Sequence, residues 1–189
     1  MRNFKTATLA FVIALSSIGL TAQNKKINIE KSTIKWVGKK VTGQHDGTIN
    51  FSSGTLVFEG DKLKGGSFEV DMTSILVKDL EAGKGKEKLE GHLKSADFFG
   101  VDKFNTATLE FKSIGAKGSD IYAVTADLTI KGITEPVKFD IALGAGSART
   151  SLKINRTKYD IKYGSGSFFD NLGDKAIDDD FELNIILNY

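Results

Sequence analysis

The chain of 189 residues contains no cysteine, one proline and only two histidines. Without cysteine there is neither disulfide nor thiolate chemistry, and no cysteine can carry a lipid anchor. The two histidines, His45 and His92, lie far apart with no local ligand spacing, so we expect no metal site. The sequence has no Gly-x-Ser-x-Gly turn and no phosphate-binding glycine loop. We therefore expect no catalytic residue, no enzyme activity and no cofactor.

Long hydrophobic runs are scarce too, and the one clear example lies at the start of the chain. Two basic residues precede an apolar run over residues 7–20, and Ala22 offers a small residue for cleavage before Gln23. The run is too short for a good membrane span, and the pattern is typical of an export signal. We predict a signal peptide over residues 1–22 and one domain over residues 23–189, periplasmic or secreted after cleavage.

An excess of one charge is also missing. The chain has 26 basic and 24 acidic residues, and two of the basic ones, Arg2 and Lys5, fall in the predicted signal peptide. The mature chain is therefore neutral, without the electrostatic footprint of a nucleic-acid-binding protein. We expect a small-molecule partner, no nucleic acid and no membrane span. The sequence does not decide between a monomer and a homodimer.

What the sequence does have, from residue 33 onward, is alternation of apolar and polar residues. Residues 121–130 are an example, with every second side chain apolar, as expected for antiparallel strands that have one face on an interior. This strand would span roughly 33 Å at about 3.3 Å per residue, against about 17–20 Å for a usual strand. We count about eight or nine strands in meander order. The sequence predicts an all-β fold, an elongated antiparallel β-barrel of about eight strands.

Two local features interrupt the strands. Leu89, His92 and Leu93 recur at helical spacing before Gly100, which predicts one short helix after a loop over residues 80–88. Because so short a helix is marginal on its own, we expect it at one end of the barrel. Pro136, the only proline, lacks an amide donor and should sit at a strand start or at a break in a ladder.

The inward rows of the predicted strands are almost wholly apolar, which suits a lumen for a long hydrocarbon chain. Phe98 and Phe99 should pack at or line one barrel end. Phe168 and Phe169, on a loop rich in glycine and serine, are candidates for a movable gate, with surface packing as the alternative. The remaining apolar candidates for ligand binding are Trp36, Phe51, Phe58, Phe68, Leu128, Ile130, Phe139 and Phe181.

Two polar residues share the inward parity. His45 has two interpretations, a hydrogen-bond partner for a lipid head group or a buried histidine satisfied by backbone or by a carboxylate. Arg156 needs an anionic partner, because an isolated charge is costly to bury. That partner is either a protein carboxylate or a ligand phosphate or carboxylate.

Several segments resemble the YceI-like family: Gly43–Gly47, Phe68–Met72, Gly91–Phe99, Asp127–Thr134 and the region of Arg156. The resemblance covers nearly all of the predicted mature chain, and the segment from Gly91 to Phe99 is its most specific part. It implies an exported bacterial protein with a lipocalin-like barrel that binds polyisoprenoid or other long amphiphilic lipids without catalysis.

Two functional hypotheses follow. The first is an exported lipid-binding protein that holds one polyisoprenoid or fatty-acyl lipid as its ligand in the barrel. The second is a secreted barrel with a packed interior that acts through its surface as an interaction or stress-related protein. The sequence does not separate them, because the same aromatic side chains can line a lumen or fill it.

Overall fold

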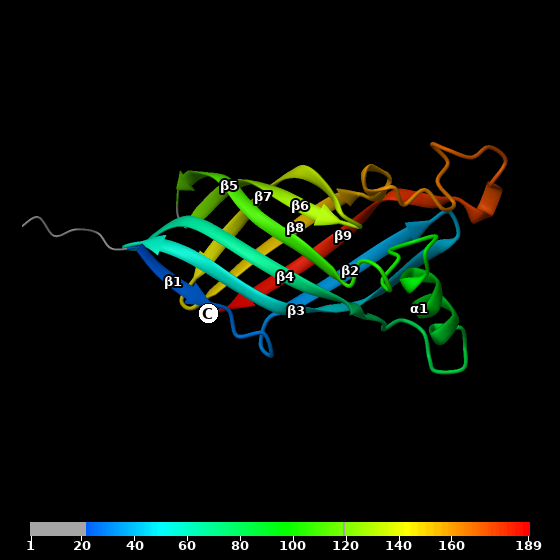
Figure 1. Ribbon diagram of the computed structural model, residues 1–189, viewed down its shortest axis with the longest axis horizontal. Helices are drawn as coiled ribbons and strands as arrows, with labels where there is room; N and C mark the ends of the chain where they lie inside the picture. The colour runs from blue at the N-terminus through cyan, green and yellow to red at the C-terminus, as the bar shows by residue number, and fades with distance from the viewer. Residues whose placement is uncertain (1–21, 119) are drawn as a thin grey trace, which may run out of the picture.

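The computed structural model of the chain describes residues 22–118 and 120–189, so the predicted signal peptide lies outside the described residues except for Ala22. The described chain forms an elongated barrel with one short α-helix at one end (Figure 1). The strands are β1 (Ala22–Lys26), β2 (Thr33–Lys40), β3 (Gly43–Glu59), β4 (Lys62–Val77), β5 (Thr106–Gly118), β6 (Ile121–Ile130), β7 (Ile133–Gly144), β8 (Ser147–Asn155) and β9 (Ile177–Asn188).

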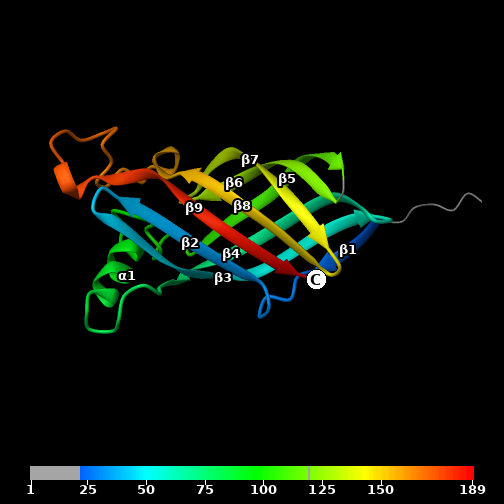
Figure 2. The same cartoon turned by 180° about the vertical axis from the view of Figure 1, so that it is seen from behind.

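Strands β2 to β9 close the barrel. Each pairs antiparallel with the next along the chain, and β9 pairs with β2, as in the register Trp36↔Leu183. Viewed from behind, β2, β9 and β8 lie side by side (Figure 2). Strand β1 adds to the part of β3 that β2 does not reach, with Lys26 opposite Thr55. The prediction of an elongated antiparallel barrel of eight strands with one short helix is confirmed.

The alternation of buried and exposed side chains along each strand places the core inside the barrel. In β6, which has the bounds predicted for that strand, every second side chain is buried while the others are exposed or partly exposed. The buried set faces inward because successive side chains of a strand point to opposite faces. These residues are Tyr122, Val124, Ala126, Leu128 and Ile130.

The α-helix α1 (Lys86–Lys94) begins earlier than predicted, so part of the expected loop over residues 80–88 is helical. Gly85, with φ of 101°, allows the sharp entry that a side chain would oppose. The Glu87 carboxylate accepts the Gly83 amide at 3.0 Å and the Glu90 carboxylate accepts the Val77 amide at 2.8 Å. These contacts tie the helix to its own loop and to β4.

Pro136 lies inside β7, where it pairs only with Asp127 of β6. Strand β8 joins β7 only between Ile141 and Gly144, so the missing amide of Pro136 leaves no ladder bond unmade. Pro136 therefore lies neither at a strand start nor at a break in the β6–β7 ladder, but in the part of β7 that has a neighbouring strand on one side only.

The two ends of the barrel differ. At one end, the Phe58 and Tyr189 rings lie 5.6 Å apart and the Lys25 ammonium is 4.6 Å from the Phe58 ring. The opposite end, called the mouth below, is formed by α1, the β2–β3 turn and residues 156–177 (Figure 1). Two short 3₁₀-helices lie in that last segment, η1 (Arg156–Tyr159) and η2 (Gly173–Lys175). No helix within the described ranges has the length and apolar character required to cross a membrane.

Candidate ligand-binding site

Two cavities adjoin each other inside the barrel. The larger, of about 140 Å³, lies toward the mouth, and the smaller, of about 70 Å³, lies deeper. They share five lining residues, so they form two parts of one lumen. The shared residues are Ile34, Val70, Ala107, Leu128 and Leu183.

The lining of the larger cavity changes character along the barrel. Its deep part is entirely apolar, whereas its outer part, toward the mouth, includes Arg156, Asp178 and Asp180. Phe98 and Phe99, which follow α1, line the same cavity, and their rings lie 5.2 Å apart. An apolar interior with polar groups only at its entrance suits an amphiphile whose tail enters first.

Aromatic rings narrow the smaller cavity. Phe51 lies 6.0 Å from Phe68, Phe68 lies 5.8 Å from Phe111, and Phe111 lies 5.8 Å from Phe139, measured between ring centroids. Gly66 leaves room for the Phe111 ring, which would lie 2.8 Å from a Cβ at that position. The deep half of the lumen is therefore partly filled by side chains, and the outer half is more open.

Most of the candidates predicted from the sequence line one of the two cavities. They are Trp36, Phe51, Phe68, Phe98, Phe99, Leu128, Ile130, Phe139, Arg156 and Phe181. Phe58 is buried at the end opposite the mouth and lines neither cavity, and Phe168 and Phe169 are exposed on the loop that follows η1. His45 stands at the mouth beside Asp79. Ligand contact by any of these residues stays a prediction.

The guanidinium of Arg156 is almost fully engaged by backbone carbonyls. Its Nη1 donates to the carbonyls of Ile161 and Tyr163 at 2.8 and 2.9 Å. Its Nε donates to the carbonyl of Asp178 at 2.9 Å, and its Nη2 donates to that of Ile177 at 3.0 Å. Since the side chain is only 2% exposed, these bonds offset the cost of burying its charge.

The anionic partner of Arg156 is a protein carboxylate. Asp179 Oδ1 lies 3.6 Å from Arg156 Nη2, and Asp179 Oδ2 accepts the Ser167 hydroxyl at 2.5 Å. Burial would raise the pKa of Asp179, but the hydroxyls of Ser165 and Ser167 and the charge of Arg156 outweigh burial and lower it. Of the two interpretations of Arg156, the geometry favours the protein carboxylate, with the carbonyls of the mouth as additional partners.

His45 also has a carboxylate partner. Its Nδ1 lies 2.7 Å from Asp79 Oδ2, while Asp79 Oδ1 accepts the Asp46 amide at 3.1 Å. These bonds join the start of β3 to the segment that leads into α1. His45 thus has the carboxylate partner of the second interpretation, but its side chain is 32% exposed and lines neither cavity, so the expectation of a buried histidine is wrong.

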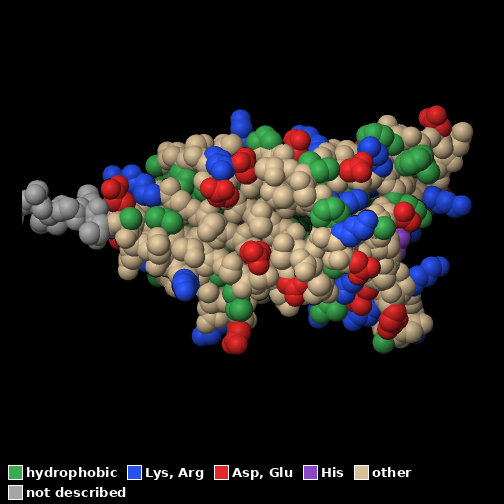
Figure 3. All heavy atoms as spheres, viewed as in Figure 1, with side chains coloured by type: hydrophobic (Ala, Val, Ile, Leu, Met, Phe, Trp, Pro, Cys, Tyr) green, Lys and Arg blue, Asp and Glu red, His purple; other side chains and the backbone are tan. Residues whose placement is uncertain are grey.

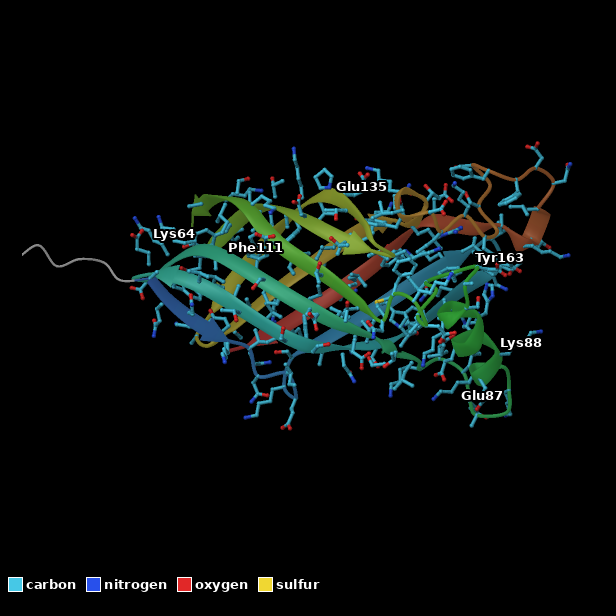
Figure 4. All side chains as sticks on the ribbon, in the orientation of Figure 1. Lys64, Glu87, Lys88, Phe111, Glu135 and Tyr163 are labelled. Carbon is cyan, nitrogen blue, oxygen red and sulfur yellow. The ribbon has the colours of Figure 1, made fainter. Side chains whose placement is uncertain are left out.

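His92 of α1 lies between two aromatic rings, 4.4 Å from Tyr163 and 5.6 Å from Phe98. Tyr163 lies at the same end of the barrel as Glu87 and Lys88 of α1, far from Lys64 (Figure 4). The helix and the loop after η1 therefore meet across the mouth. Among residues 22–118 and 120–189, no group of three or more His, Cys, Asp or Glu side chains is placed to hold a metal ion.

The sequence analysis did not single out Met72 and Ile75 as lining residues, although both are buried against the larger cavity. Met72 and Ile75 are three residues apart, so regular alternation would place them on opposite faces of β4. Both face the interior because the β3–β4 register shifts between Thr48 and Asn50. The Ser74 hydroxyl accepts the Asn50 amide at 2.8 Å and so satisfies a backbone group at the irregularity. The polar residues between Met72 and Ile75 are the only sequence sign of this bulge.

The comparisons with known proteins agree with this architecture. The family model of the YceI-like domain matches residues 25–189. A UPF0312 protein of Staphylococcus aureus (strain bovine RF122 / ET3-1) is 40% identical over 85 residues, which are 39% of this chain and 47% of the relative. A UPF0312 protein of Azotobacter vinelandii is 31% identical over 91 residues, or 48% of this chain and 45% of the relative. The chain thus spans about half the length of the curated relatives it matches.

Solved structures show the same fold at low sequence identity. BcnA from Burkholderia cenocepacia superposes with a TM-score of 0.68 at 21% identity, over 85% of this chain and 98% of that one. A polyisoprenoid binding domain from Saccharophagus degradans, implicated in plant cell wall breakdown, superposes with a TM-score of 0.56 at 14% identity, over 86% of this chain and 95% of that one. Because the family model covers the described barrel almost completely, the chain belongs to the YceI-like family.

Proposed function

We propose that this chain is an exported binding protein that holds the tail of one long-chain amphiphilic lipid, of polyisoprenoid or fatty-acyl type, without catalysis. The observation that carries the proposal is the lumen itself, two adjoining cavities with an apolar lining that reach from the mouth into the barrel. Membership of the YceI-like family and the fold shared with a polyisoprenoid binding domain support it.

The charges that border the lumen favour an uncharged buried part of the guest. Arg156 is occupied by backbone carbonyls and Asp179, and the Asp180 carboxylate lies 3.1 Å from Lys153 Nζ. A charged head group drawn inward would lose its hydration, and Arg156 and Asp180 already have partners of opposite sign there. The head group therefore stays at the mouth, and the tail fills the lumen.

Tail burial then dominates the affinity. Each buried methylene contributes up to about 0.8 kcal/mol, and ordering a flexible tail returns part of that gain. Affinity should therefore rise with tail length until the lumen is full, and change less with the head group.

Trp36 provides the measurement, because it is the only tryptophan of the chain and it lines the larger cavity. Its fluorescence can follow titration with a series of lipids that share one head group and differ in tail length. Affinity that rises with tail length and then levels off is the expected result. An affinity independent of tail length would contradict the proposal.

Native mass spectrometry of gently purified protein, followed by organic extraction, identifies the guest. A reproducible adduct of hydrocarbon-like composition is expected. The mass of the protein tests the export proposal at the same time, because cleavage near Ala22 removes a segment of known mass.

One observation favours the second candidate function, a barrel with a packed interior that acts through its surface. The Phe51, Phe68, Phe111 and Phe139 rings already occupy much of the deep lumen. A protein of clean apo mass after purification from a lipid-containing host would favour this alternative.

A further inference from the structure

Exposed apolar side chains gather at the mouth. Among the described residues, eight large hydrophobic side chains are exposed, and half of them belong to the β2–β3 turn and the loop between η1 and β9. We call these four residues the apolar rim: Val41, Tyr163, Phe168 and Phe169. Figure 3 shows hydrophobic side chains on that loop, and charged residues of both signs scattered over the visible barrel wall.

Backbone hydrogen bonds hold the rim in place. The Val41 amide donates to the Ala176 carbonyl at 3.3 Å, which joins the β2–β3 turn to the loop. The amides of Phe168 and Phe169 both donate to the carbonyl of Ser165, at 3.1 and 3.0 Å, and Ser165 is fully buried. Phe168 and Phe169 are each 51% exposed, so the fold holds these rings toward solvent instead of packing them inside.

The rim adjoins residues that line the lumen at the mouth. Arg156 and Ile177 line the larger cavity, and Arg156 also binds the carbonyls of Tyr163 and Ile177. A tail that leaves the barrel at the mouth therefore passes the rim. Exposing an alkyl chain to open water costs free energy in proportion to its apolar area.

The chemistry of the rim fits the surface of a lipid bilayer. The Lys162 ammonium lies 5.2 Å from the centre of the Phe168 ring. Aromatic rings with a lysine beside them suit the interface between head groups and acyl chains, where the rings meet apolar chains and the ammonium stays hydrated. Lys175 and Asp174 on the same loop keep its charge mixed, so apolar contact provides most of the attraction.

We propose that the apolar rim docks on a lipid bilayer, so that the guest passes between bilayer and lumen without crossing water. This rests on the proposed lipid-binding function. It adds a partner surface and assigns Phe168 and Phe169 to bilayer contact.

Vesicle flotation tests the proposal, with the mature protein after cleavage near Ala22 and vesicles of phosphatidylcholine with some phosphatidylglycerol. The test variant is F168S/F169S. The matched control, I121S/I186S, removes two apolar side chains that are each 39% exposed and lie on the barrel wall away from the mouth. Thermal unfolding verifies that each variant is folded, and light scattering after gel filtration gives its oligomeric state.

Wild type and control should float with the vesicles. F168S/F169S should bind at least about tenfold more weakly, since each phenylalanine buried in the interface can contribute about that factor. Equal flotation of F168S/F169S and wild type, or a wild type that does not float, would overturn the proposal. A dimeric wild type together with a monomeric F168S/F169S would also overturn it, because the rim would then be a contact between two copies. Native mass spectrometry reports separately whether wild type carries lipid, so a failure of the lipid-binding function is distinguishable from a failure of docking.

Discussion

The guanidinium carbon of Arg156 lies 5.8 Å from the centre of the Phe98 ring. This contact joins the segment that follows β8 to the segment that follows α1, across the outer part of the lumen. The donors of Arg156 bind carbonyls of the loop between η1 and β9 and of the start of β9. Arg156 therefore fixes the position of this loop and also supports Phe98. The shape of the mouth thus depends on one buried side chain.

Replacement of Arg156 by lysine should destabilise the protein strongly. An ammonium on a flexible stem cannot reproduce the flat fork of donors, so buried carbonyls of the mouth lose their partners. We expect the free energy of unfolding to fall by about 3 kcal/mol or more, measured by urea denaturation. Arg149→Lys, on the exposed face of β8, is the matched control and should change stability by less than about 0.5 kcal/mol.

The same variant separates the two interpretations of Arg156. If Arg156→Lys keeps wild-type stability but loses affinity for anionic lipids alone, the arginine serves the ligand, and the structural role described here is wrong.

Gly47 of β3 has no room for a side chain. A Cβ there would meet the Leu76 carbonyl oxygen and lie 2.5 Å from the indole of Trp36. Backbone and indole are both fixed by packing, so Gly47→Ala should lower the free energy of unfolding by about 1–3 kcal/mol. A shift of the Trp36 emission should accompany the loss.

Gly38→Ala is the control for that change. Gly38 lies on the neighbouring strand β2 and also lines the larger cavity, yet a Cβ there meets no atom within 4 Å. The free energy of unfolding of Gly38→Ala should stay within about 0.5 kcal/mol of the wild-type value. Similar losses in both variants would show that strand glycines matter here for a reason other than space.

The barrel could be predicted from sequence because alternation is a local signal. In β6, burial follows the alternation residue by residue, and the long strands fix a tall barrel. The same parity placed Trp36 and Phe181 on the lumen, where the structure finds them. A period of two is preserved wherever a strand is regular, so no tertiary information is needed.

Two kinds of feature could not be predicted from the sequence. The shift of parity in β4 between Met72 and Ile75 depends on a bulge against β3, which alternation cannot show. The partners of Arg156 are carbonyls of residues 161–178, and a carbonyl exists at every residue, so no residue type marks them. Likewise, the pairing of His45 with Asp79 is set only by the fold.

The Asp79 carboxylate should make the free energy of unfolding depend on pH in the acidic range. Burial would raise the pKa of Asp79, but hydrogen bonds from His45 and from the Asp46 amide outweigh burial and lower the pKa below 3.8. A lowered folded-state pKa contributes stability above the unfolded-state value, and that stability is lost as pH falls through the folded-state pKa. Asp79→Asn should therefore lose less stability than wild type between pH 5 and about pH 3.

Urea denaturation at a series of pH values measures this difference. Asp61→Asn, on the exposed β3–β4 turn, serves as the control and should follow the wild-type curve. Parallel curves for wild type and Asp79→Asn would mean that the carboxylate contributes nothing to the acid dependence.

Ala107 should set the length of tail that the lumen accepts. It is a small, buried residue of β5, only 7% exposed, and it lines both cavities where they adjoin. Leucine at this position would fill space at the junction and cut the deep cavity off from the mouth. Because the extra methylenes of a long tail need the deep cavity for burial, Ala107→Leu should bind long tails about tenfold more weakly and short tails nearly as well as wild type.

Titration of Trp36 fluorescence with short-tailed and long-tailed lipids measures both affinities in one protein. The short-tailed lipid is the internal control, because an unfolded or closed barrel would lose both ligands. If Ala107→Leu weakened short and long tails by the same factor, the deep cavity would hold no part of the guest. Tail binding would then be confined to the larger cavity beneath Phe98 and Arg156.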